Sequence, residues 1–389
     1  MRPMSELASS AAAPSPGTGA DLPGSADVGQ PADVDLELLE AEARRVIGEM
    51  PYAYYAGAAD EERLLAENRA AWGRHRLHPR VLVDVSVVDP STTLLGAPVA
   101  SPVFVAPTAI QGLAHPDGEV ATAVGAARAG ACLILSSLAT RSLEDVAEAA
   151  PDAVRWMQVY VVRDRSATAE LVARAKAAGY RALVVTVDAP VSGLRLRELR
   201  GQVRLPDDLD LPNLAPSAGE RAHRGGFMAV VTSEFDRSLT YDDIGWLAGL
   251  SGLPVVVKGV QRADDAARCV AAGAAGVVVS NHGARQLDDA PPTAEVLARV
   301  VDAVGGRAEV YVDGGIRRAA DAAKALALGA RGVGVGRPLL WALATGGSAG
   351  VASLLDWLRA ELERVMALCG APTVDDLDRG LVEPEGTAQ

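Results

Sequence analysis

Residues 276–288, GVVVSNHGARQLD, decide the fold class, because a short apolar run changes abruptly there into polar and glycine residues. A strand buried on both faces of a parallel sheet has such a uniformly apolar pattern. Seven more runs of this kind are VFVAP (103–107), CLILSS (132–137), VRWMQVY (154–160), ALVVTVD (182–188), PVVVKG (254–259), EVYVDGG (309–315) and RGVGVG (331–336). Ala-rich helical stretches separate the eight runs. The pattern predicts an α/β protein with a single (β/α)8 TIM barrel.

The segments that flank these runs define the predicted domain organisation. They are a disordered tail (1–33), an N-terminal helical extension (34–101), the barrel with its C-terminal helix (102–375) and a second tail (376–389). The first tail is rich in Ala, Pro, Gly and Ser, which bury too little apolar surface to offset the entropy of ordering. Apolar residues at helical spacing predict amphipathic helices over 34–50 and 351–368.

The interval between the fourth and fifth predicted strands is unusually long, at about 65 residues. Its part from 201 to 237 is rich in Pro, Gly, Asp and Arg. Long loops in compact domains are usually functional lids or disordered segments. Because this interval follows a barrel strand, we expect it to overhang the active-site face.

Composition excludes several classes of function. The chain has 389 residues and a net charge of −13, so a nucleic-acid partner is not expected. Its three cysteines are sparse and include no CxxC pair, which argues against a disulfide framework or a metal site. No apolar run reaches the roughly 18 residues of a membrane helix, and the N-terminus lacks a convincing signal peptide. The sequence therefore predicts a cytoplasmic protein without a membrane partner.

Polar residues follow every predicted barrel strand. They are Thr108, Ser136, Ser137, Gln158, Tyr160, Thr186, Asp188, Lys258, Ser280, Asn281, His282, Asp313 and Arg337. Working residues of barrel enzymes lie at the C-terminal strand ends. A barrel with a purely structural role would not need this full ring of polar groups, so the pattern indicates an active site.

The segment 280–288 carries the most informative pair of side chains. His282 lies three residues before Arg285 on a glycine-containing turn. A histidine can act as a base near neutral pH, and an arginine can bind a carboxylate through two parallel hydrogen bonds. A loop histidine beside a surface arginine fits this segment alone equally well.

Two glycine- and arginine-containing loops follow the last two strands. DGGIRR (313–318) and GVGRP (334–338) occupy the usual phosphate position of this fold, where Arg317 and Arg337 add positive charge. The alternative is that these glycines only form tight turns. Lys258 ends the strand PVVVK, and an inward lysine would need a charged partner. The alternative for Lys258 is an outward side chain that reaches solvent.

These motifs together resemble the FMN-dependent 2-hydroxy acid oxidases and dehydrogenases, including glycolate oxidase, lactate oxidase, mandelate dehydrogenase and hydroxymandelate oxidase. The resemblance extends from about residue 54 to residue 337. It rests on YYAGAADEE…ENRAA (54–71), APTAIQGLAHPDGE (106–119), LSSLAT (135–140), MQVYV (157–161), TVDAP (186–190), VKG (257–259), SNHGARQLD (280–288), DGGIRRAAD (313–321) and GVGRP (334–338). The pair SNHGxRQLD and DGGIRR is nearly diagnostic.

The resemblance implies a set of catalytic and substrate-binding roles. His282 is expected to take a proton from the substrate, with Asp188 stabilising its protonated form. Tyr160 is expected to hydrogen-bond the substrate oxygen. The substrate carboxylate is expected to bind Arg285, Arg195 and Tyr54.

The resemblance also implies FMN as the cofactor. Lys258 would stabilise the reduced flavin near its N1–O2 edge. The other expected contacts with FMN are Pro107, Thr108, Ala109, Ser136, Gln158, Thr186, Ser280, Asp313, Gly315, Arg317, Gly336 and Arg337. No metal is expected.

The chain departs from the family pattern around the substrate. Leu138 stands where glycolate oxidase carries a tryptophan, and Leu194 and Leu196 replace a basic and an acidic residue. These changes put the substrate in question rather than the chemistry. We expect an (S)-2-hydroxy acid larger than glycolate, such as mandelate or 4-hydroxymandelate. By analogy with the family, a homotetramer is expected.

Four classes of function remain open on the sequence. The leading hypothesis is an oxidase that passes electrons to O2 and forms H2O2, because Ala109 resembles the oxidase members. The closest alternative is a dehydrogenase with a quinone or protein acceptor. A flavin-free, phosphate-binding barrel enzyme would explain the glycine-arginine loops but not the set of His282, Arg285 and Tyr160. An inactive FMN-binding interaction protein is disfavoured by the intact His282 and Asp188.

Overall fold

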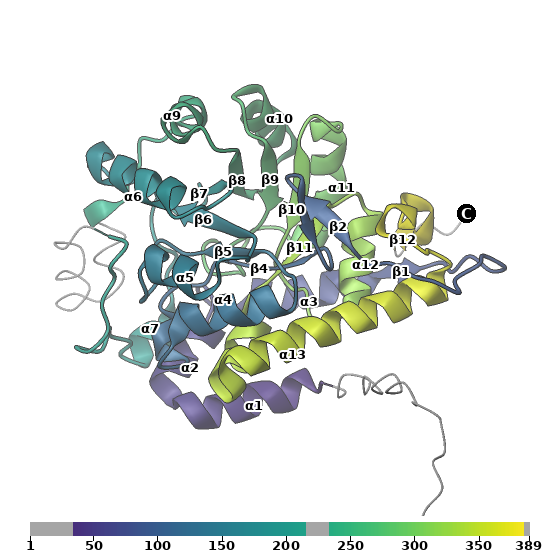
Figure 1. Ribbon diagram of the computed structural model, residues 1–389, viewed down its shortest axis with the longest axis horizontal. Helices are drawn as coiled ribbons and strands as arrows, with labels where there is room; N and C mark the ends of the chain where they lie inside the picture. The colour runs from purple at the N-terminus through teal and green to yellow at the C-terminus, as the bar shows by residue number, and fades with distance from the viewer. Residues whose placement is uncertain (1–33, 215–232, 385–389) are drawn as a thin grey trace, which may run out of the picture.

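Eight parallel strands close into a barrel with the order β10-β11-β4-β5-β6-β7-β8-β9 (Figure 1). The computed structural model describes residues 34–214 and 233–384. The barrel strands are β4 (Val103–Val105), β5 (Leu133–Leu135), β6 (Arg155–Val159), β7 (Leu183–Thr186), β8 (Val255–Val260), β9 (Gly276–Val279), β10 (Glu309–Val312) and β11 (Gly332–Val335). Each coincides with one of the eight apolar runs, so the predicted (β/α)8 barrel is confirmed.

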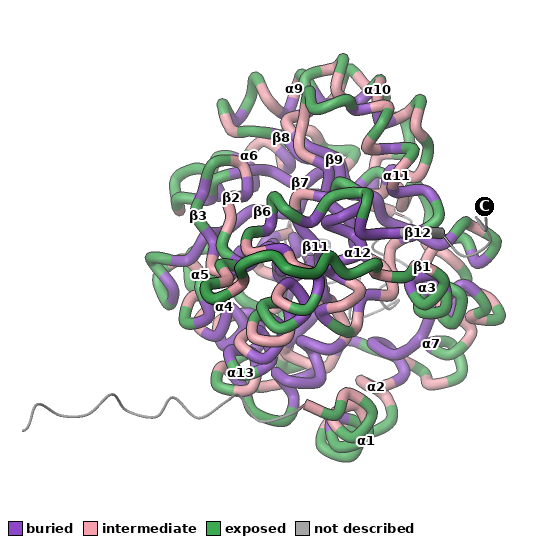
Figure 2. Tube along the Cα trace, turned by 90° about the vertical axis from the view of Figure 1, so that its right-hand side faces the viewer, coloured by how far each residue is buried: buried purple, intermediate pink, exposed green. Residues whose placement is uncertain are grey.

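Helices surround the barrel and connect successive strands. They are α1 (Leu36–Ile47), α2 (Glu49–Ala56), α3 (Arg63–Arg74), α4 (Gly118–Arg128), α5 (Leu143–Ala149), α6 (Arg165–Ala177), α7 (Leu196–Arg200), α9 (Asp242–Ser251), α10 (Ala263–Ala271), α11 (Thr293–Val304), α12 (Ala319–Ala327) and α13 (Arg337–Cys369). The short elements are β1 (His75–Leu77), β2 (Thr92–Leu94), β3 (Ala97–Val99), β12 (Val382–Pro384) and the 3-10 helices η1 (Gln111–Leu113), η2 (Val374–Asp376) and η3 (Arg379–Leu381). Figure 2 shows that buried residues are concentrated in the barrel, whereas the surrounding helices expose much of their outer surface.

The predicted helix over 34–50 is divided in two. Asp35 caps α1 by accepting hydrogen bonds from the backbone N–H groups of Glu37 and Leu38. Gly48 then adopts φ 80°, a left-handed conformation that favours glycine and ends the helix. The chain restarts as α2, which carries the buried Tyr54 toward the barrel.

The C-terminal helix is longer than the predicted 351–368. α13 begins directly after β11 and is interrupted at Gly347, which adopts φ 54° and ψ −140°. By length and composition α13 could cross a membrane, but 67% of its apolar window is buried within the fold. It packs against α4, α1 and α12. This packing accounts for its apolar composition without a membrane.

The N-terminal end of the barrel is closed by aromatic side chains. Trp156 contacts Tyr311 edge to face with ring centroids 5.4 Å apart, and Phe104 contacts Tyr311 in the same way at 5.9 Å. All three are fully buried. A cavity can therefore form only toward the C-terminal ends of the strands, where barrel enzymes carry their active sites.

The ordered domain extends beyond the predicted boundary at residue 375. The segment 376–389, predicted to be a tail, contains η3 and β12, and β12 pairs antiparallel with β1. Leu381 is fully buried, so this pairing adds apolar contacts as well as backbone hydrogen bonds. The predicted tail at 1–33, residues 215–232 of the predicted lid and residues 385–389 lie outside the described residues.

Candidate active site

One cavity lies at the C-terminal mouth of the barrel, with ≈ 1120 Å³ of space including its opening. Its walls contain most of the predicted site residues: Tyr54, Pro107, Thr108, Ala109, Ser136, Leu138, Gln158, Tyr160, Thr186, Arg195, Lys258, His282, Arg285, Asp313, Gly315, Arg317, Gly336 and Arg337. The other two, Asp188 and Ser280, lie directly behind these walls and hydrogen-bond to residues that line the cavity. Parallel strands bring these distant residues together because all their carboxyl ends meet at one rim.

His282 and Asp188 form a partly buried pair at this rim, with side chains 19% and 12% exposed. The distance from His282 Nδ1 to Asp188 Oδ1 is 2.9 Å. Because an ionised carboxylate only accepts hydrogen bonds, Nδ1 carries the hydrogen and Nε2 remains available to take a proton. Burial lowers the pKa of His282 below its usual value, although the charge of Asp188 opposes this shift. The imidazole is therefore held in the neutral form that a base requires.

Asp188 remains ionised although most of its side chain is shielded from solvent. Burial acts to raise its pKa, but His282 and then Lys258 outweigh this effect and hold the pKa below its ordinary value. Its second oxygen, Oδ2, has no hydrogen-bond partner within the described part of the chain. Gly259, at φ 107°, lies against the carboxylate, and a Cβ there would come within 2.6 Å of Asp188 Cγ. The glycine therefore provides the space that Asp188 occupies.

Lys258 points inward and is paired. Its Nζ donates a hydrogen bond to Ser280 Oγ at 2.9 Å and lies 3.3 Å from Asp313 Oδ2. Ser280 Oγ donates to Asp313 Oδ1 at 2.6 Å and accepts from the backbone N–H of His282 at 3.1 Å. The predicted inward lysine is thus observed, and Asp313 supplies the opposite charge that such a lysine needs.

Gln158 connects three neighbouring strand ends. Its Oε1 accepts a hydrogen bond from the Ser137 backbone N–H at 3.1 Å, and its Nε2 donates to Thr186 Oγ1 at 3.0 Å. On the next strand end, Thr108 Oγ1 accepts from Gln111 Nε2 at 2.9 Å. These hydrogen bonds fix a polar strip along the cavity wall.

The loops after β10 and β11 form a narrow, positively charged part of the cavity. Gly315 adopts φ 80°, and a Cβ there would come within 2.3 Å of the Asn68 carbonyl oxygen. Burial and then the neighbouring Arg69 lower the pKa of Arg317 to about 10. Burial and neighbouring arginines also lower the pKa of Arg337 well below its usual value. Within 34–214 and 233–384, no acid lies within ion-pair distance of Arg317 or Arg337.

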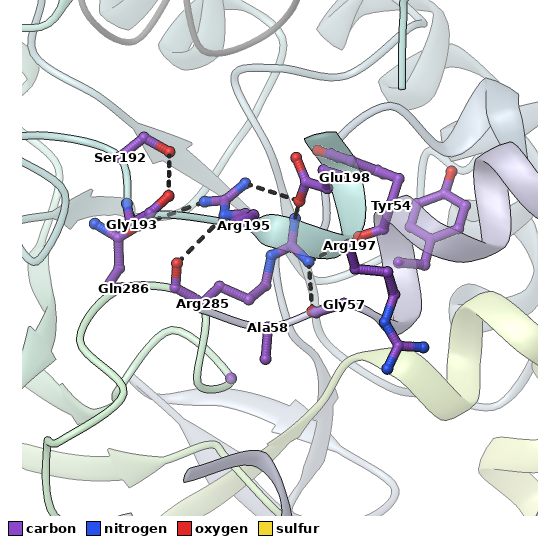
Figure 3. Close-up of polar contacts among 12 residues, drawn as sticks. Tyr54, Gly57, Ala58, Ser192, Gly193, Arg195, Arg197, Glu198, Arg285 and Gln286 are labelled. Carbon is purple, nitrogen blue, oxygen red and sulfur yellow. Dashed lines mark hydrogen bonds and ion pairs between the residues drawn. The ribbon is translucent and has the colours of Figure 1, made fainter. Parts of the chain in front are cut away.

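A second basic region contains Arg195 and Arg285 (Figure 3). Arg285 Nη1 donates to the carbonyls of Tyr54 and Gly57 at 2.7 and 2.9 Å, and its guanidinium lies 5.1 Å from the Tyr54 ring centroid. Glu198 lies between the two arginines, 2.8 Å from Arg285 Nη2 and 3.3 Å from Arg195 Nη1. Burial raises the pKa of Tyr54 to about 12, so its hydroxyl stays protonated at neutral pH.

An apolar wall faces these arginines. The rings of Tyr160 and Phe235 stack with centroids 4.2 Å apart and planes inclined by 20°. Leu138 packs in the same cluster, with Ala109 at its edge. Burial raises the pKa of Tyr160, which keeps its hydroxyl available as a hydrogen-bond donor. One side of the cavity thus combines a hydroxyl donor with an apolar surface.

The cavity has the features that FMN requires. A phosphate group would supply the negative charge that the partly buried Arg317 and Arg337 lack, beside a glycine backbone that an anion can approach closely. The polar strip suits the hydrogen-bonding atoms of the isoalloxazine ring and the ribityl chain, and Lys258 supplies a cation beside this strip.

Three residues in or next to the cavity walls, Phe235, Gln286 and, behind Arg195 and Arg285, Glu198, were not predicted as site residues. Phe235 lies in the long interval between β7 and β8, where no strand pattern indicates direction, and Glu198 lies in the short helix α7. Gln286 lies inside the quoted motif 280–288, but its role became visible only from its hydrogen bonds. Its Nε2 donates to the carbonyls of Asp188 and Val191, each at 2.8 Å. It thereby joins the loops after β7 and β9.

Comparison with known proteins agrees with this geometry. Residues 43–384 match the model of the FMN-dependent dehydrogenase family. The chain belongs to this family. It is therefore an FMN-dependent oxidoreductase, as predicted.

The relatives of this family member include several named oxidases. An L-lactate oxidase from Nostoc sp. is 46% identical over 352 residues, covering 89% of this chain and 96% of the relative. A glycolate oxidase from Spinacia oleracea is 45% identical over 343 residues, covering 87% and 93%. A solved structure of mandelate oxidase with (S)-4-hydroxymandelic acid has a TM-score of 0.85 and 41% identity, covering 90% of this chain and 98% of that one.

Proposed function

We propose that the protein oxidises an (S)-2-hydroxy acid to the 2-oxo acid and passes the two electrons to O2, forming H2O2. The proposal rests on one observation: His282, which is paired with Asp188, lines the same cavity as two arginines suited to a carboxylate. FMN, when bound, accepts the two electrons that the substrate loses. The protein residues bind and orient the substrate and move its proton.

His282 acts as the base in this proposal. Its Nε2 takes the proton from the substrate, and Asp188 stabilises the resulting imidazolium through the 2.9 Å contact with Nδ1. Burial excludes water and strengthens this interaction between charges. The Tyr160 hydroxyl donates a hydrogen bond to the substrate oxygen, while Arg195, Arg285 and Tyr54 bind the carboxylate.

The remaining polar residues of the cavity hold the cofactor. Lys258 would lie beside the flavin and stabilise negative charge on it. Arg317 and Arg337, with the backbone of Gly315 and Gly336, would bind the phosphate. The remaining residues assigned to FMN are Pro107, Thr108, Ala109, Ser136, Gln158, Thr186, Ser280 and Asp313.

The substrate is proposed to be larger than glycolate, with mandelate and 4-hydroxymandelate as the first candidates. The stacked rings of Tyr160 and Phe235, together with Leu138, provide an apolar surface beside the proposed carboxylate site. An aromatic side chain gains from such a surface by apolar burial and ring contacts. The similarity to a mandelate oxidase supports the same choice.

Anaerobic mixing with a panel of 2-hydroxy acids tests both the chemistry and the substrate. We expect mandelate to bleach the flavin absorbance faster than glycolate does. Faster reduction by glycolate would refute the proposed substrate, and no bleaching by any acid would refute the proposed activity. Admission of air then tests the acceptor, because an oxidase forms one H2O2 for each 2-oxo acid. Rapid flavin reduction without peroxide would instead indicate a dehydrogenase with a quinone or protein acceptor.

A homotetramer is proposed as the assembly. The loop after β1 exposes the apolar residues Val81, Leu82 and Val87, and Leu368 near the end of α13 is also exposed. Exposed apolar clusters of this kind usually mark protein interfaces. Light scattering coupled to size exclusion is expected to give four times the mass of 40.1 kDa. A monomer in this measurement would refute the assembly.

A cytoplasmic location is also proposed. Cys132, Cys269 and Cys369 are unpaired and buried, which fits a reducing compartment. Cell fractionation with antibody detection tests this location, and recovery in the membrane or periplasmic fraction would contradict it.

A further inference from the structure

Glu198 is the acid that joins the two arginines of the proposed carboxylate site. Its side chain is 8% exposed, and its Oε1 lies 2.8 Å from Arg285 Nη2 and 3.3 Å from Arg195 Nη1 (Figure 3). A single buried carboxylate oxygen thus contacts both guanidinium groups. Sequence spacing brings Glu198 near Arg195 on one helical turn, but only the folded chain brings Arg285 to the same oxygen.

The arginines are also held by groups other than Glu198. Arg285 Nη1 donates to the carbonyls of Tyr54 and Gly57. Arg195 Nε donates to the Arg285 carbonyl at 3.3 Å, and its Nη2 donates to Gln286 Oε1 at 3.4 Å. Loss of the negative charge on Glu198 would therefore leave both guanidinium groups with most of their positioning contacts.

The charges of this region do not cancel. Two guanidinium groups and one carboxylate leave one surplus positive charge, which matches the single carboxylate of a 2-hydroxy acid. Burial and then the charge of Arg285 lower the pKa of Arg195, whereas Glu198 opposes this shift. In a buried region, little solvent screens the interaction between charges. Removal of one negative charge there should therefore strengthen the binding of an anion considerably.

We propose that Glu198 is a charge-balancing residue that limits the carboxylate site to one surplus positive charge and so keeps anion binding weak enough for product release. Glu198 acts through Arg195 and Arg285 and does not itself touch the substrate. The inference rests on the proposed function, since it needs a carboxylate as the ligand of these arginines. The 2-oxo acid product keeps that carboxylate, so excess positive charge would retain it.

The variant Glu198→Gln tests the inference because it removes the charge and keeps the shape. Calorimetric titration of the FMN-loaded protein with benzoate measures carboxylate binding without turnover. We expect benzoate to bind about tenfold more tightly to the variant, as one charge fewer in a weakly screened site implies. Binding of the neutral mandelamide should not change. In turnover, kcat should fall through slow product release, while anaerobic flavin reduction at saturating mandelate keeps its rate.

Two further substitutions serve as controls. Glu62→Gln removes a neighbouring carboxylate that pairs with Arg197 rather than with the two arginines, and it should leave benzoate affinity unchanged. Ser192→Asp adds a negative charge at the cavity wall without altering Glu198, and it should weaken benzoate binding relative to the matched Ser192→Asn. This pair keeps the test decisive if Glu198→Gln does not fold.

The outcomes separate the inference from the proposed function. Unchanged or weaker benzoate binding to FMN-loaded Glu198→Gln overturns the charge-balancing role and leaves Glu198 as a structural tether only. Equal affinities of Ser192→Asp and Ser192→Asn overturn it as well. The proposed function is tested separately, because it fails if no 2-hydroxy acid reduces the wild-type flavin, whatever the affinity for benzoate.

Discussion

Replacing Asp188 with Asn should slow flavin reduction on the order of 10²–10⁴-fold. The substitution keeps an oxygen near His282 Nδ1, at the 2.9 Å position of Asp188 Oδ1, but removes its negative charge. Breaking a buried charge pair costs about 3–5 kcal/mol. That cost falls mainly on the protonated imidazole, which forms during the reaction, and each 1.36 kcal/mol corresponds to about tenfold in rate. In the wild-type protein the charge of Asp188 opposes the effect of burial on the pKa of His282. Loss of that charge should therefore lower the pKa of His282 further.

Anaerobic stopped-flow absorbance with saturating mandelate, or with the best acid of the panel, measures this rate directly. The matched control is Asp289→Asn, which removes an exposed carboxylate seven residues beyond His282 and should reduce the flavin at the wild-type rate. Both variants must bind FMN in the wild-type ratio for the comparison to hold. A rate for Asp188→Asn within about threefold of wild type would refute the assignment, because it corresponds to less than 1 kcal/mol.

Three further predictions concern the FMN site and the protonation state of His282. Gly315→Ala should abolish FMN retention and lower the melting temperature. The added Cβ would come within 2.3 Å of the Asn68 carbonyl oxygen, and φ 80° is strained for alanine. Full retention of FMN by the variant would contradict this prediction. The value of kcat/KM should fall on acidification, with an inflection at a pKa below 6.5. The neutral imidazole is the active form, and burial lowers the pKa of His282. An inflection above pH 7 would count against His282 as the base. Arg337→Lys should weaken FMN binding and lower the free energy of unfolding by about 1–3 kcal/mol. One ammonium cannot replace the hydrogen bonds that Arg337 donates to the Tyr55, Gly57 and Gly283 carbonyls. An unchanged free energy of unfolding in chemical denaturation would disprove this prediction.

The barrel could be predicted because its signal is local. A strand buried on both faces, such as Val277–Val279 in β9, must be apolar throughout, whatever its neighbours are. Once eight such strands are parallel, their carboxyl ends lie on one rim. The positions of Lys258, His282 and Asp313 around one cavity then follow from the topology.

Other features depend on contacts between distant residues and left no local pattern. The boundary at 375 differed from the structure because β12 is held by pairing with β1, about 300 residues earlier in the chain. Phe235 joins the apolar wall through stacking on Tyr160, although its own segment has no strand or helix periodicity.

The sequence by itself determined the fold class, the cofactor family and the inventory of groups that could act in the site, because each rests on local periodicity or on short motifs. Only the tertiary structure decided how those groups are paired. It placed Asp313 on Lys258 and Glu198 between two arginines 90 residues apart in the chain, and it gave the Asp188–His282 pair, which the family resemblance had implied, its 2.9 Å contact. The physical reason is that pKa values and anion affinity depend on burial and on charges a few ångströms away, and these distances exist only after the chain has closed into the barrel.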